Sequence, residues 1–132
     1  MMYNLLKTAA LLLFVDLFYL LTGGIFAKHM YERIQGRDLQ PRYLAAIPVY
    51  LAMAYLLLQT KSYTEAALYG LCVYTVYDMT NYTIFQQYDL KIAVVDMIWG
   101  ATLFAFTRYL LKNVVWHSNI LTWRMSFDIL TF

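Results

Sequence analysis

The sequence predicts an all-α membrane protein, a bundle of four transmembrane helices with a short C-terminal tail. Of its 132 residues, 62% are hydrophobic and only 14% are charged, whereas soluble domains average roughly 45–50% apolar and about 25% charged residues. The apolar residues gather in runs, and about 20 such residues suffice to cross a bilayer. Short polar segments separate the runs, so the chain has room for one compact membrane domain.

The first apolar run covers residues 8–27 and is interrupted only by Asp16. We expect a retained span rather than a cleaved signal peptide, because a carboxyl group inside the apolar region is untypical of a signal sequence. The helix is expected to continue beyond the bilayer to Gly36, since glycine commonly ends helices in the left-handed conformation. A polar turn with Pro41 follows.

The second and third spans are predicted at residues 43–59 and 65–85. Pro48 lies in the second run and removes one backbone hydrogen bond, so we expect a kink there unless neighbouring groups satisfy the freed carbonyl. The third span begins at Glu65, whose negative charge suits a helix N-terminus.

The fourth span is predicted at residues 92–111. No linker or internal repeat divides the chain, so residues 1–112 form one four-helix transmembrane domain and residues 113–132 a tail. Four spans place both termini on one side of the membrane. The 10 basic residues divide evenly between the two sides, which leaves the orientation and the host membrane open.

Three aspartates inside the apolar runs, Asp16, Asp78 and Asp96, are the strongest chemical signal. A charge at the bilayer centre costs about 2.5–3.5 kcal/mol on insertion scales. These side chains should therefore face the bundle interior, be protonated, or share a cation. The helical rise places Asp78 and Asp96 in the half of the bilayer that faces the first and third turns, and Asp16 near mid-span, so the three could converge in that half.

Helical spacing puts phenol, amide and indole groups on the same stripes as these carboxyl groups. Such a stripe is interpreted either as a proton or cation site or as a hydrogen-bonded core that fixes helix register. The candidate residues for both are Asp16, Tyr19, Tyr74, Tyr77, Asp78, Thr80, Asn81, Asp96 and Trp99. Gly70 and Gly100 are expected to allow close helix packing.

Four groups of residues carry a resemblance to a known family: Asp16-Leu-Phe-Tyr19-Leu20, Met30-Tyr31, Gly70-x3-Tyr74-x2-Tyr77-Asp78-x-Thr80-Asn81 and Asp96-x2-Trp99-Gly100. Over roughly residues 8–111 the chain resembles the small predicted membrane proteins grouped as domain of unknown function 2177. Tyr19 is a departure, because the family usually has tryptophan there. The resemblance implies a four-helix membrane bundle with the three aspartates in one constellation, and it implies no activity.

The tail alternates apolar and polar residues from Leu121 to Ile129, the period of an extended strand. A single strand needs a partner's sheet edge or surface, and Trp116, Trp123 and Phe127 are the expected docking residues. The alternative is an interfacial segment with its tryptophans among the lipid headgroups.

Function is the least determined property. The sequence shows no nucleophile with an adjacent base, phosphate loop, zinc motif or cofactor fingerprint, so an enzyme, a cofactor and a metal site are not expected. A net charge of +2 without a basic cluster gives no support for nucleic-acid binding.

Two functions fit an integral membrane protein of this kind. The first is a non-catalytic structural or accessory subunit of a larger membrane assembly, in contact with the bilayer and with other membrane subunits or further copies of itself. The alternative is a small proton- or cation-linked transporter or channel component that uses the intramembrane aspartates.

Overall fold

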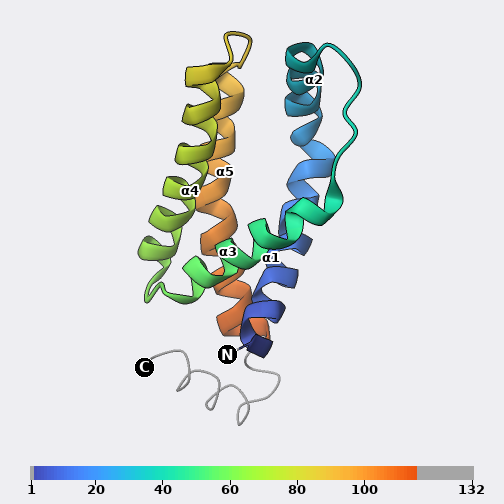
Figure 1. Ribbon diagram of the computed structural model, residues 1–132. Coiled ribbons are helices and arrows are strands. Elements are labelled where there is room, and N and C mark those ends of the chain that lie inside the picture. The colour runs from blue at the N-terminus through green and yellow to red at the C-terminus, as the bar shows by residue number, and fades with distance from the viewer. Residues whose placement is uncertain (1, 116–132) are drawn as a thin grey trace.

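The computed structural model describes residues 2–115, and the regular structure in that range is all helical, as expected (Figure 1). The elements are α1 (Met2–Thr22), α2 (Gly24–Gln35), the 3₁₀ turn η1 (Tyr43–Ala45), α3 (Ala46–Leu58), α4 (Tyr63–Ile84), α5 (Leu90–Leu110) and the short π-helix η2 (Leu111–Val115). The predicted docking residues Trp116, Trp123 and Phe127 lie outside the described residues. Their role stays a prediction.

Helices α4 and α5 form a long antiparallel pair, and α1 packs against both α3 and α5 (Figure 1). The shorter α3 lies obliquely across the lower half of the view in Figure 1, while α2 extends α1 toward the upper end. The bundle thus has a tight pair of helices on one side and a looser group of three on the other.

The helix ends follow from local sequence. Ser62 caps α4, because its hydroxyl accepts a 3.1 Å hydrogen bond from the backbone N–H of Glu65. Gly36 ends α2 with a φ of 81°, which confirms the expected left-handed cap. Pro48 lies in the first turn of α3, directly after η1, and a proline there disturbs fewer hydrogen bonds than one in mid-helix.

The expected continuous helix from the first span to Gly36 is wrong at one point. The chain leaves regular α-helix at Gly23, so α1 ends at Thr22 and α2 begins at Gly24. Two consecutive glycines weaken a helix, because glycine loses the most backbone freedom on ordering.

Two helical segments in the described range are long and apolar enough to cross a membrane: Met2–Thr22 and Leu90–Asn113. The four predicted spans are therefore not confirmed. With 13 residues, α3 is roughly 20 Å long, shorter than a hydrocarbon core of about 30 Å. The longer α4 has 22 residues, but its five tyrosines and four threonines lower its hydropathy.

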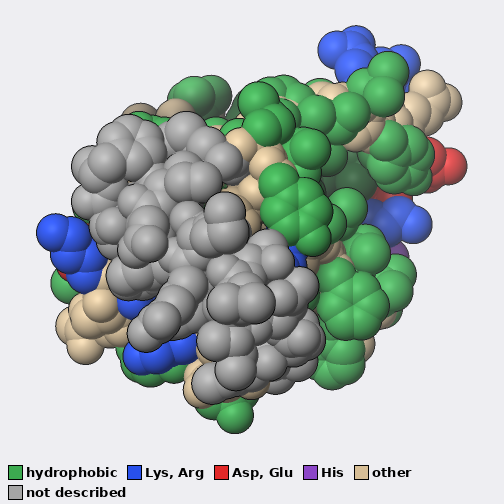
Figure 2. All heavy atoms as spheres, turned by 90° about the horizontal axis from the view of Figure 1, so that it is seen from below, with side chains coloured by type: hydrophobic (Ala, Val, Ile, Leu, Met, Phe, Trp, Pro, Cys, Tyr) green, Lys and Arg blue, Asp and Glu red, His purple; other side chains and the backbone are tan. Residues whose placement is uncertain are grey.

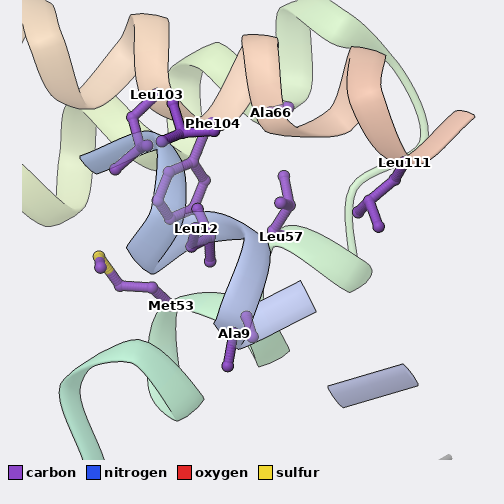
Figure 3. Packing of buried hydrophobic residues seen from close by; sticks show 10 residues of the cluster. Ala9, Leu12, Met53, Leu57, Ala66, Leu103, Phe104 and Leu111 are labelled. Atoms are coloured by element: carbon purple, nitrogen blue, oxygen red, sulfur yellow. The ribbon is translucent and has the colours of Figure 1, made fainter. Parts of the chain in front are cut away.

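Buried apolar side chains from α1, α3, α4 and α5 form the main core. Figure 3 shows Phe104 of α5 pointing toward Leu12 of α1, with Met53 and Leu57 of α3 nearby. Many large apolar side chains instead face outward, and Figure 2 shows hydrophobic groups around the flanks of the molecule. Exposed apolar surface on this scale is atypical of a soluble monomer.

Helices α4 and α5 approach each other at Gly70 and Gly100. A Cβ atom added to Gly70 would overlap the carbonyl group of Gly100, and one added to Gly100 would overlap the ring of Tyr74. Only glycine at these positions lets the two backbones lie this close.

Candidate functional site

A cavity of about 640 Å³ lies between α1, α2, α3, α4 and the first turns of α5. Most of its walls are apolar, including Leu20, Met53, Leu56, Val73 and Ile92. Three carboxyl groups also line it, those of Asp16, Asp78 and Asp96. The structure therefore brings the three aspartates to one space.

Asp16 is 5% exposed and both of its carboxyl oxygens accept hydrogen bonds. The Tyr50 hydroxyl donates to Oδ2 at 2.5 Å, and the Trp99 indole Nε1 donates to Oδ1 at 2.8 Å. Since Tyr50 is on α3 and Trp99 on α5, this carboxyl group joins three helices.

Asp78 is 1% exposed, and among the described residues only one of its two carboxyl oxygens has a hydrogen-bond partner. Its Oδ1 accepts a 2.7 Å hydrogen bond from the hydroxyl of Tyr88, in the turn between α4 and α5. Its Oδ2 has no hydrogen-bond partner among the described residues. Burial raises the pKa of the Tyr88 phenol, and the hydrogen bond to Asp78 acts in the same direction, so Tyr88 remains a donor at neutral pH.

Asp96 is half-buried and lies beside Asp78 and Tyr19. Tyr19 in turn stacks on Trp99, with 4.8 Å between ring centroids and 9° between planes. In residues 2–115 no basic side chain forms an ion pair with the three aspartates. That range also contains no group of three His, Cys, Asp or Glu side chains arranged to hold a metal ion.

A chain of three phenols leads from the protein surface to Asp78. The hydroxyls of Tyr77 and Tyr31 are 2.8 Å apart, and those of Tyr31 and Tyr88 are 3.1 Å apart. The Tyr88 hydroxyl donates its only hydrogen to Asp78, so in the bond with Tyr31 it is the acceptor. Tyr31 thus donates to Tyr88 and accepts a hydrogen bond from Tyr77. Tyr77 is 53% exposed, so the chain connects a buried carboxyl group with the outside.

The structure brings most of the predicted site residues together. The cavity is lined by Asp16, Tyr19, Tyr74, Tyr77, Asp78 and Asp96. Trp99 does not line the cavity but donates a hydrogen bond to Asp16. Thr80 and Asn81 do not line the cavity, and Thr80 is exposed.

Three tyrosines of the site were not predicted from the sequence: Tyr31, Tyr50 and Tyr88. Tyr31 belongs to the Met30-Tyr31 pair of the family resemblance, which was the one available signal for it. Tyr50 and Tyr88 reach their aspartates only through the tertiary fold, 34 and 10 residues away along the chain.

The comparisons with known proteins yield one match. The sequence model of a family described as "Predicted membrane protein (DUF2177)" matches residues 1–112. No curated protein matches the chain. No solved structure matches it either.

Proposed function

The chain belongs to the DUF2177 family of predicted membrane proteins, and we propose that it is a multi-pass protein that takes up protons or cations at its intramembrane aspartates and moves them across the bilayer. The observation that carries this proposal is that Asp16, Asp78 and Asp96 line one cavity. Ionisable residues at membrane depth are costly and typically mark ion pathways.

A third membrane-spanning segment, α4, is part of the proposal. At 22 residues it is roughly 33 Å long, which exceeds the hydrocarbon thickness of about 30 Å. Its polar residue Asp78 is buried, whereas Leu68 and Val76 are exposed. Apolar side chains therefore form part of the outward surface of α4, together with exposed tyrosine and threonine side chains such as Tyr77 and Thr80.

The phenol chain supports proton uptake in particular. Each hydroxyl in such a chain donates one hydrogen and accepts another, so a proton that enters at Tyr77 releases a different proton from Tyr88 to Asp78. The carboxyl groups of Asp78 and Asp96 lie side by side, and two carboxylates at close range repel each other when both are ionised. Sharing a proton or a cation relieves that repulsion.

Proteoliposomes that contain the full-length protein and an internal pH indicator test this function. We expect proton or cation flux under an imposed gradient, and we expect Asp78→Asn to abolish it. Tyr31→Phe should slow proton flux at least about tenfold, because it breaks the phenol chain but leaves the carboxyl groups in place. Asp38→Asn removes an exposed loop carboxylate and is the matched control. Absence of flux under every gradient would contradict the proposal.

A second candidate, the accessory subunit, is favoured by the hydrogen bonds of Asp16. They join α1, α3 and α5, as a carboxyl group that sets helix register would. Under this function Asp16→Asn retains the fold and assembly, and deletion of residues 113–132 releases the protein from a companion that copurifies in mild detergent. Unchanged assembly after the deletion would argue against a docking tail.

A further inference from the structure

We propose that the cavity binds a lipophilic organic cation, a molecule with one positive centre and apolar substituents, which enters sideways from the lipid. This inference rests on the proposed function and names the substrate class of the same site. Four features of the cavity support it: its size and walls, its charge, its aromatic rings and its mouth.

The size and walls of the cavity suit an organic molecule. A volume of about 640 Å³ falls in the range of roughly 300–1,000 Å³ that is typical of small-molecule sites. Apolar residues from four helices line it, among them Leu20, Met53, Val73 and Ile92. A proton or a hydrated metal ion makes no use of such walls, whereas apolar substituents gain free energy by contact with them.

The charge of the cavity selects a cation. Its lining holds three carboxyl groups and one basic side chain, Lys28. The Lys28 side chain is 61% exposed and lies 3.8 Å from the Glu32 carboxylate, so its charge is balanced at the rim. Three carboxyl groups and one lysine that is already paired leave the cavity with an excess of acidic groups, which favours a positively charged ligand.

Aromatic rings surround the same space. The lining includes Tyr19, Tyr31, Tyr50, Tyr74, Tyr77 and Tyr88. The face of an aromatic ring attracts a cation by about 0.5–2 kcal/mol, most strongly away from water. This attraction needs no N–H donor, so it extends to quaternary ammonium and phosphonium ions.

The mouth of the cavity opens on an apolar flank. Val49 and Ala52 of α3 line the cavity and are exposed at the surface, Val49 by 52%. Their exposed neighbours on the same helix, Ile47 and Tyr55, are apolar or aromatic. A ligand dissolved in the bilayer can therefore reach the carboxyl groups without first crossing a polar surface.

Equilibrium dialysis of the full-length protein in detergent against tetraphenylphosphonium tests the inference. Tetraphenylborate, of the same shape and opposite charge, is the control ligand. We expect saturable binding of the phosphonium only. Asp78→Asn and Asp96→Asn should each weaken it about tenfold or more, equivalent to about 1.4 kcal/mol, and the exposed-loop variant Asp38→Asn by less than about twofold. Equal binding of both ligands, or equal binding to all variants, would overturn the inference.

A further variant keeps the test valid if the aspartate variants fold poorly. Ala52→Trp places a large ring at the exposed mouth, where surface substitutions usually change stability by less than about 0.5 kcal/mol. It should weaken phosphonium binding although every carboxyl group remains. Unchanged binding to this variant would overturn the lateral entry. Proton flux that depends on Asp78, without any phosphonium binding, would overturn the inference that the cavity binds an organic cation and would leave the proposed function standing. Phosphonium binding without flux would support the binding site and overturn the proposed transport.

Discussion

Replacement of Gly70 by alanine is the sharpest test of how α4 and α5 are held together. The added methyl group would overlap the carbonyl group of Gly100 and would lie 2.9 Å from the Cβ of Phe104. Ordinary contacts of a Cβ atom are 3.4–4 Å long. Because the Gly100 atoms belong to the backbone, no side-chain rotation relieves the overlap and the two helices must move apart.

The expected loss of stability is about 2 kcal/mol. Overpacking of a tight core typically costs 1–3 kcal/mol. Because the overlapped Gly100 atoms belong to the backbone, we expect a cost at the upper end of this range, about 3 kcal/mol. The higher helix propensity of alanine relative to glycine offsets about 1 kcal/mol of this cost. For a chain of 132 residues, a net loss of about 2 kcal/mol lowers the midpoint of thermal unfolding by roughly 8 °C.

The assay is thermal unfolding in detergent, followed by far-ultraviolet circular dichroism. Gly24→Ala is the matched control, since its added methyl group meets only ordinary contacts of 3.6–3.8 Å, and its midpoint should be unchanged or slightly raised. If Gly70→Ala is as stable as the control variant, the close packing of α4 on α5 is refuted.

Two further predictions concern local hydrogen bonds. Tyr50→Phe removes one donor to Asp16 and should destabilise the protein by about 0.6–1.7 kcal/mol, measured against Tyr55→Phe, which alters an exposed ring on the same helix; equal stabilities would show that the bond contributes nothing. Ser62→Ala removes the cap of α4 and should cost about 1 kcal/mol. The control is Thr64→Ala at an exposed position of the first turn, and a loss of the same size in both variants would contradict a capping role.

Much of the helical layout is local information and could be predicted. The apolar runs mark α1 and α5, and Gly36 ends α2 as its residue type suggests. The break at Gly23 was missed, although the Gly23-Gly24 pair is a local signal of a weakened helix. The second apolar run, predicted at residues 43–59, coincides with the helical segment Tyr43–Leu58. A span there is not confirmed, since an apolar sequence alone does not tell a span from a buried helix.

The candidate site likewise contains residues that the sequence identifies and residues that only the tertiary structure identifies. Asp78 and Tyr77 were identifiable because they lie in an apolar run at helical spacing. Tyr50 was not, since one more tyrosine in an apolar run looks like any interfacial aromatic residue. Its role depends on the packing of α3 against α1, and the cavity itself exists only once five helices meet.

The glycine contact and the carboxyl pair are parts of one arrangement. Asp78 lies eight residues after Gly70 and Asp96 four residues before Gly100, or about 12 Å and about 6 Å along the two helix axes from their closest approach. Side chains lean toward the N-terminus of their own helix, so in this antiparallel pair the two aspartates lean toward each other and close the remaining gap. Gly70→Ala, which separates the helices, should therefore also weaken phosphonium binding.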